Sequence, residues 1–191
     1  ILMAIEKPAY TVIEKERNIE IRSYQPYITA EVVMPGRDFN EAANRGFSPL
    51  ANFIFGANDA SNKISVTAPV TAQPASEKIA MTSPVTVTSR EDGTSGDYRV
   101  SFMMPSKYTL DTLPKPLDSR VEFHAQPARK MAVIRFSGTF QQPNFDQHLS
   151  QLRAWLKSRE MREKGMPVMA GYDPPFTPWF LKHNEILIEI E

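Results

Sequence analysis

Alternating apolar and polar residues predict strands in several parts of the chain. Ile19–Tyr24 (IEIRSY) alternates, and Tyr27–Met34 continues in an extended pattern after Pro26. A third stretch, Tyr98–Met104, has an apolar side chain at every second position. Because successive side chains of a strand point to opposite faces, each pattern indicates a strand with one buried face.

A first helix is predicted from Asp38 to Gly56. Asp38 is a capping residue with Glu41 three positions later, and Gly56 offers a stop. Pro49 lies inside the stretch, so we expect the helix to be kinked or split there. The apolar residues at helical spacing are Ala42, Ala43, Phe47, Leu50 and Ile54.

A second helix is predicted over Asn144–Gly165, with Asn144 as its capping residue. Its apolar stripe consists of Phe145, Leu149, Leu152 and Leu156. A hairpin of Val121–Gln126 and Lys130–Gly138 precedes this helix, and further strand candidates begin at Met166 and Asn184. The order of elements therefore starts again in the second part of the chain.

A nine-residue pattern, K-I-x-x-T-x-P-V-T, occurs at Lys63–Thr71 and again at Lys78–Thr86. We expect each copy to be a strand that ends at a Thr-x-Pro-Val corner; the alternative is a pair of ordinary edge strands. Together with the paired strands, the repeat predicts two hairpin–helix–two-strand halves with Tyr98–Met104 between them. The fold class is therefore α+β, and the paired strands exclude a Rossmann-type sheet.

Composition indicates one globular unit. A chain of 191 residues is long enough for one well-cored domain, which we place at residues 10–191 after an N-terminal segment of residues 1–9. The 22 basic and 22 acidic residues give a net charge of zero, so no nucleic-acid partner is expected. The absence of cysteine excludes disulfides, thiolate metal sites and cysteine nucleophiles.

No apolar run is long enough to cross a bilayer, so we expect a soluble protein without a membrane span. The chain starts without Met, and Ile1–Ala4 is interpreted either as the end of a removed signal or anchor or as an expression remnant. The first interpretation predicts an extracytoplasmic location. The second leaves the compartment and the oligomeric state open.

Three segments carry a family resemblance. Lys78–Thr86 (KIAMTSPVT) and Gly171–Ile190 (GYDPPFTPWFLKHNEILIEI) resemble the SOUL haem-binding family, and Ile19–Tyr27 (IEIRSYQPY) resembles its opening strands. The resemblance implies a distorted β-barrel of two pseudo-twofold βαββ halves with a helix on each. It also implies a binding protein for haem or a related tetrapyrrole, without an enzymatic activity general to the family.

A tetrapyrrole site needs an apolar slot with basic groups at its rim, because haem is a flat apolar ring with two carboxylates. The residues that we expect in the slot are Phe47, Leu50, Phe53, Met81, Pro84, Phe176 and Trp179. The rim candidates are Arg45, Lys78 and Lys182. For each residue, the alternative interpretation is an ordinary core side chain or a solvated surface charge.

The chain has three histidines that could be considered as iron ligands. His124 lies on the polar phase of its strand, and His148 lies at the border of a helical stripe, so neither is expected to bind iron. His183 is the weak candidate for the haem ligand, with an anion contact or a surface position as alternatives. No other metal site is predicted.

A second hypothesis is a GyrI-like domain that binds lipophilic cations or hydrolyses a small molecule. Its candidate is Glu185, since a carboxylate drawn into an apolar slot would have a raised pKa. The alternative is a rim glutamate paired with Lys182 or Arg135. Hydrolase elbow, phosphate-loop and H-E-x-x-H motifs are all missing. Because the family resemblance implies a binding protein, we expect non-catalytic binding of a tetrapyrrole or another flat hydrophobic ligand.

Overall fold

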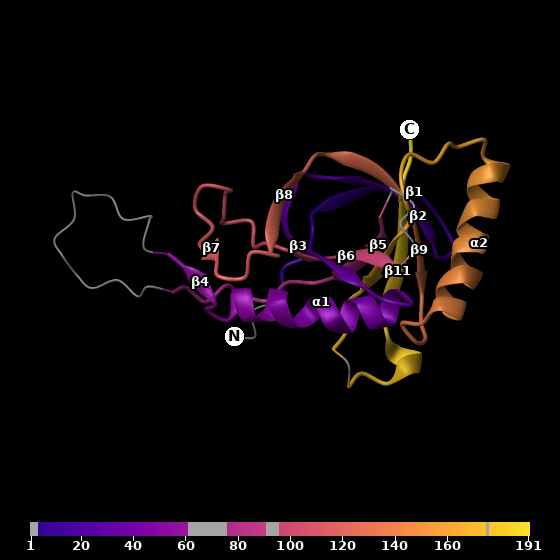
Figure 1. The fold of residues 1–191 in the computed structure, drawn as a ribbon. Helices are drawn as coiled ribbons and strands as arrows, with labels where there is room; N and C mark the ends of the chain where they lie inside the picture. Colours follow the sequence, from indigo (N-terminus) through magenta and orange to yellow (C-terminus); the bar gives the residue numbers. More distant parts are fainter. Residues whose placement is uncertain (1–3, 61–75, 91–95, 175) are drawn as a thin grey trace.

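The computed structural model describes residues 4–60, 76–90, 96–174 and 176–191 of the chain. A large antiparallel sheet and two helices make up most of this part (Figure 1). The strands of the sheet are β1 (Tyr10–Glu16), β2 (Ile19–Tyr24), β3 (Tyr27–Pro35), β5 (Val85–Ser89), β6 (Asp97–Met103), β8 (Glu122–Gln126), β9 (Arg129–Phe136), β10 (Val168–Gly171) and β11 (Asn184–Glu189). The other elements are helices α1 (Phe39–Ile54) and α2 (Gln142–Ser158), the 3-10 helix η2 (Trp179–Leu181), and the short pair β4 (Asn58–Asp59) and β7 (Lys115–Pro116).

The strand order is β1-β2-β9-β11-β10-β5-β6-β3-β8. Apart from β1, the order is symmetric about the neighbouring strands β10 and β5. Strands at equal distances from this centre have the same place in the two halves of the chain: β2 corresponds to β8, β3 to β9, β5 to β10 and β6 to β11. A duplicated unit would produce such an order, and the superposition of the two halves stays a prediction. One detail was wrong: the predicted strand Tyr98–Met104 corresponds to β6, which pairs with β5 and β3 rather than standing between two halves.

The sheet is open. Its two ends in the described part are β1 and β8, which do not pair with each other. Closure of a barrel requires the two end strands to pair, so the closed form of the expected distorted barrel is not found. Figure 1 shows a strongly curved sheet, with α1 along β3 and β6 and with α2 beside β9.

The two faces of the sheet carry different clusters. In β9, Ala132 and Ile134 belong to the main core together with the helices, whereas Met131 and Val133 belong to a smaller cluster on the opposite face. The same alternation in β11 directs Glu185 away from the helices. The chain therefore has a helix-covered face and an inner face, and the inner face carries buried charge.

Helix α1 begins as predicted. The Asp38 side chain accepts a hydrogen bond of 2.9 Å from the backbone N–H of Glu41. Pro49 does not split the helix, so the split form of that expectation is wrong, and a kink stays a prediction. Gly46 allows α1 to lie close to β6, because a Cβ atom at Gly46 would be 2.7 Å from the side chain of Val100.

Helix α2 starts earlier and ends sooner than predicted. It begins at Gln142 with Pro143 in the first turn, and Asn144, the predicted cap, lies inside the helix. It ends at Ser158, shortly before Glu160 adopts the left-handed φ of 56°. The buried residues of its predicted stripe are Phe145, Leu152 and Leu156. Neither α1 nor α2 is long and apolar enough to span a bilayer.

The repeated pattern has only one copy in the described part, because Lys63–Thr71 lies outside it. The second copy forms a strand only from Val85 onward, so the expected strand before the Thr-Ser-Pro corner is wrong. Thr82 instead forms an isolated parallel bridge with Glu6, and its hydroxyl donates to the carbonyl of Met103 at 2.6 Å. The corner therefore anchors the N-terminal segment to the sheet.

Candidate ligand-binding groove

A groove, which we call the α1 groove, lies between α1 and the chain that joins β10 to β11. Its volume is about 250 Å³. The α1 residues that line it are Asn40, Ala43, Asn44 and Phe47. The remaining lining residues are Val85, Phe140, Gly171, Asp173, Lys182 and Asn184.

Helical geometry explains why four residues of α1 line the groove together. Its four residues are spaced i, i+3, i+4 and i+7, which places them on one face of the helix. Phe47 is 41% exposed there, whereas Leu50 and Phe53 are 0% and 1% exposed and belong to the main core. Phe53 lies about 120° around the helix axis from Phe47, so the two side chains point to different sides of α1. Leu50 and Phe53, predicted as slot residues, therefore do not line this groove.

The rim of the groove carries one amine and one carboxylate. Of the three predicted rim residues, Lys182 lines the groove. Asp173 lies there as well, and its carboxylate accepts a hydrogen bond from the backbone N–H of His183. Arg45 is directed elsewhere, since its guanidinium lies 3.1 Å from the carboxylate of Glu41.

The loop between Asp173 and Lys182, which we call the aromatic loop, carries exposed apolar side chains. Phe176 is 86% exposed and Trp179 is 63% exposed, and the neighbouring Phe180 and Leu181 are 58% and 64% exposed. Such a group of exposed large side chains is typical of a binding surface. Phe176 and Trp179 thus lie next to the groove in the chain, but they do not line it as predicted.

The other predicted residues lie away from the α1 groove. Met81 is half-buried against the main core, and Lys78 is exposed. Pro84 is buried and lines a different cavity on the inner face of the sheet. Of the corner of the repeated pattern, Val85 therefore lines this groove, whereas Pro84 does not.

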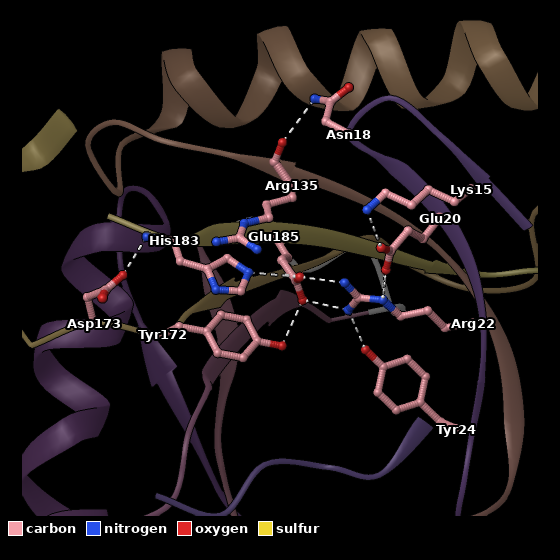
Figure 2. Close-up of polar contacts among 10 residues, drawn as sticks. All are labelled: Lys15, Asn18, Glu20, Arg22, Tyr24, Arg135, Tyr172, Asp173, His183 and Glu185. Carbon is pink, nitrogen blue, oxygen red and sulfur yellow. Dashed lines mark hydrogen bonds and ion pairs between the residues drawn. The ribbon is translucent and has the colours of Figure 1, made fainter. Parts of the chain in front are cut away.

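A buried charged cluster lies behind the groove and centres on Glu185, the neighbour of Asn184. Arg22 donates two hydrogen bonds to its carboxylate, at 2.8 and 2.7 Å. The hydroxyl of Tyr172 donates at 2.7 Å, and Nε2 of His183 lies at 2.9 Å. Figure 2 shows these side chains converging on the carboxylate. All of its hydrogen-bonding capacity is thus directed at protein groups.

The cluster keeps Glu185 ionised. Burial raises the pKa of this carboxyl, but hydrogen bonds from His183 and Arg22, together with the Arg22 charge, lower it to about 2. The predicted raised pKa is therefore wrong. Its cationic partner is Arg22, and neither Lys182 nor Arg135 takes that role. Glu185 is a structural anion, because it is neither protonated at neutral pH nor free to accept another proton.

The three histidines have separate environments. The His183 ring stacks on Tyr172 with a centroid distance of 4.1 Å, while its Nε2 contacts the buried carboxylate. His148 stacks on Phe136 at 4.0 Å, and its position at the border of the stripe is confirmed. The side chain of His124 is 45% exposed, as its strand phase predicted. Within the described ranges, no group of three or more His, Asp or Glu residues could hold a metal ion.

Comparison with known sequences identifies the family. Residues 5–76 and 71–189 match the model of the SOUL heme-binding protein family. The chain belongs to this family. This SOUL protein is 25% identical over 174 residues to Heme-binding protein 1 of Xenopus laevis. The aligned region covers 86% of this chain and 84% of the relative. It is 26% identical over 194 residues to Heme-binding protein 2 of Homo sapiens, with coverage of 95% and 88%.

The fold of this SOUL protein also occurs outside the family. The C-terminal domain of EcmrR superposes with a TM-score of 0.64 at 12% identity, over 95% of this chain and 98% of that domain. At this level of identity the likeness concerns the fold alone.

Several residues of the groove and of the cluster were not predicted. Phe140 lies in a turn without a periodic pattern, so the sequence offered no signal for it. Arg22 and Tyr172 had a weak signal. Arg22 is a charged residue in an otherwise alternating strand, opposite in phase to Ile21, and Tyr172 belongs to the family-like segment Gly171–Ile190. Sequence alone could not join them to Glu185.

Proposed function

We propose that this SOUL protein binds haem or a related tetrapyrrole, without catalysis, in the α1 groove. The observation that carries the proposal is the presence of the apolar ring of Phe47 and the amine of Lys182 in one groove. An apolar wall suits the face of a tetrapyrrole, and an amine suits one of its carboxylates. Membership of the SOUL family and the names of the relatives support this ligand class.

The size of the groove indicates how the ligand would lie. Its volume of about 250 Å³ is below the range of about 300–1,000 Å³ found for pockets that enclose drug-sized ligands. A tetrapyrrole would therefore extend beyond the groove toward the aromatic loop. Phe176 and Trp179 would then cover part of the ring and lose exposure, which is favourable for large apolar side chains.

Bound haem would supply a redox-active iron, while the residues of this chain hold and orient the ring. No histidine lines the α1 groove. Nε2 of His183 is engaged by Glu185 on the other face of the sheet. The donor set therefore fits ring binding by apolar contact and an amine, without an axial ligand from the described residues.

The experiment is a haemin titration of the full chain, followed by visible absorption. Phe47→Ala removes the apolar ring from the groove, and Lys182→Glu reverses the charge of the amine. We expect each substitution to weaken haemin binding by roughly 10- to 150-fold, because a buried aromatic contact or a charged hydrogen bond contributes about 1.5–3 kcal/mol.

Matched controls separate the groove from unspecific adsorption of haemin. Phe55→Ala removes a ring that is 64% exposed just beyond α1, and Lys130→Glu reverses an exposed charge in β9. Both control positions lie outside the groove. The proposal requires unchanged binding in both controls, and equal losses in all four variants would contradict it.

The GyrI-like alternative lacks its candidate residue. A site for a lipophilic cation, or a hydrolytic site, would need a carboxylate that is free to meet the ligand. The carboxylate of Glu185 is occupied by Arg22, Tyr172 and His183. We therefore favour non-catalytic tetrapyrrole binding over this alternative.

A further inference from the structure

A second cavity, which we call the inner cavity, lies on the face of the sheet opposite to the helices. Its volume is about 120 Å³, and side chains from every strand of the large sheet except β1 line it. It shares no lining residue with the α1 groove. Tyr24 and Tyr172, both seen in Figure 2, form part of its wall and bond Arg22 and Glu185.

Arg129 is the unusual residue of the inner cavity. Its Nη2 donates to the hydroxyl of Tyr27 at 2.9 Å, but its Nε is buried and has no hydrogen-bond partner. In the part of the chain that the structure describes, no carboxylate forms an ion pair with it. An unpaired buried donor on a cation is unfavourable, and a ligand that is not part of the chain is one physical reason to retain it.

The charges of the inner cavity do not balance. Glu31 is 6% exposed and already has partners: Arg99 at 3.5 Å, the hydroxyl of Thr29 at 2.9 Å and that of Ser101 at 3.0 Å. The charged residues of the wall are Glu31, Arg99 and Arg129. With Glu31 compensated by Arg99, one positive charge is left, and Arg129 carries it.

The rest of the wall limits the size and polarity of a ligand. Met103, Met131, Val168 and Leu187 provide apolar surface. Cavities of about 150 Å³ hold a benzene ring, so about 120 Å³ with an opening suits a group of similar size. A single surplus positive charge is matched by a singly charged anion rather than by a phosphate monoester.

We propose that the inner cavity binds a small organic carboxylate. Its carboxylate oxygens accept hydrogen bonds from the guanidinium of Arg129, and its apolar body lies against Met131 and Leu187. A guanidinium suits a carboxylate because its donors are planar and match the two oxygens. This inference does not depend on tetrapyrrole binding, since the two sites have no residue in common.

The experiment compares three probes that carry the same ring and differ in charge: benzoate, benzyl alcohol and benzylamine. Each is titrated into the full chain by calorimetry and by ¹H–¹⁵N correlation spectra. We expect benzoate to bind at least about tenfold more tightly than benzyl alcohol, because the bond to Arg129 is charge-assisted. We also expect it to shift amide signals of β9 and β6. Equal binding of the alcohol, preference for the amine, or no binding of benzoate would each overturn the proposal.

A variant pair tests the role of Arg129 itself. Arg129→Met keeps the length of the side chain and removes its charge, and Arg162→Met is the matched control at an exposed position that lines neither site. Arg129→Met should lose about tenfold or more of the benzoate affinity, with a Tm equal to or above that of the parent chain. Arg162→Met should retain the affinity. A large fall in Tm, or a failure of Arg129→Met to fold, would show a structural role for Arg129 and overturn the assignment.

Discussion

Arg22 and Glu185 are 163 residues apart in the chain and form a two-armed ion pair, with N–O distances of 2.8 and 2.7 Å. Strand β9 lies between their strands β2 and β11, so the two side chains meet across it. They are 3% and 1% exposed. Loss of Arg22 would leave the buried Glu185 carboxylate with Tyr172 and His183 but without its permanent cation, whereas loss of Glu185 would leave Arg22 paired with Glu20 at 2.7 Å.

The first prediction concerns the stability that this pair controls. Arg22→Met should lower the free energy of unfolding by about 3–5 kcal/mol, since it leaves the buried Glu185 carboxylate without its permanent cation. Glu185→Leu should cost less, because Glu20 still pairs with Arg22. The double variant should lose clearly less than the sum. Urea unfolding of the parent chain, the two single variants and the double variant measures the coupling. Additive losses would mean that the two side chains do not act as a pair.

The second prediction concerns acid. Glu185 titrates at a pKa of about 2 in the folded chain, against an ordinary value of 4.5. Between these values the unfolded chain binds a proton that the folded chain does not bind. The free energy of unfolding should therefore fall as the pH falls from about 4.5 to about 2, by roughly 3 kcal/mol for this group.

Comparison with Glu185→Gln isolates the contribution of this group, because the other carboxylates are common to both proteins. Urea unfolding at several pH values should show a shallower loss of stability in the variant below pH 4.5. Parallel curves would exclude the lowered pKa. Haemin affinity of the folded variant at neutral pH should stay about unchanged, since Glu185 does not line the α1 groove.

Local sequence patterns predicted the helices and strands well, but they predicted poorly which residues surround each side chain. Asp38 and its spacing to Glu41 are a local signal, and the cap forms as predicted. Helical spacing also showed that Phe47 and Leu50 are both apolar positions of α1. It could not show that Leu50 is fully buried in the main core while Phe47, which contacts Phe102 of β6, stays 41% exposed in the groove, because the surrounding residues come from distant parts of the chain.

Charge partners were the least predictable feature. Glu185 has Lys182 nearby in sequence and Arg135 in the hairpin that precedes α2, and these were the candidates that the sequence offered. Its partner is Arg22, because the strand order places β2 two positions from β11. The direction of the pKa shift depends on that partner, and it is opposite to the raised pKa that the GyrI-like hypothesis required.

The third prediction concerns the contact between α1 and the sheet. Gly46→Ala should lower the free energy of unfolding by about 1–3 kcal/mol, because the new Cβ atom would lie 2.7 Å from the side chain of Val100. Helix propensity alone favours Ala over Gly by about 1 kcal/mol, so the sign of the effect tests the contact. Thermal and urea unfolding measure it.

Two further variants support this test. Asn52→Ala, at an exposed position of the same helix, should be neutral or slightly stabilising. Val100→Ala in the Gly46→Ala background should cost less than Val100→Ala in the parent chain, since it also removes the clash. A stabilising effect of Gly46→Ala alone would mean that α1 lies farther from β6.

The last prediction is about iron. A histidine nitrogen bound to haem iron gives a sharp, shifted Soret band, whereas a ring held by apolar contact and an amine gives a broader band and weaker binding. The Nε2 of His183 lies 2.9 Å from the carboxylate of Glu185, and its ring is stacked on Tyr172. Release of this imidazole would remove a hydrogen bond from a buried anion, which is unfavourable.

We therefore expect His183→Ala to change haemin affinity by less than about tenfold, roughly 1.4 kcal/mol, and to leave the Soret band nearly unchanged. His148→Ala is the matched control, since it removes another stacked, half-buried imidazole that lies outside the groove. Because His183→Ala also removes a bond to Glu185, the measurement is made well below the unfolding temperature of each variant. The contradicting outcome is a sharp Soret band in the parent chain that disappears only in His183→Ala. It would show that the imidazole binds iron instead of Glu185, and that the site includes the residues at the start of β11.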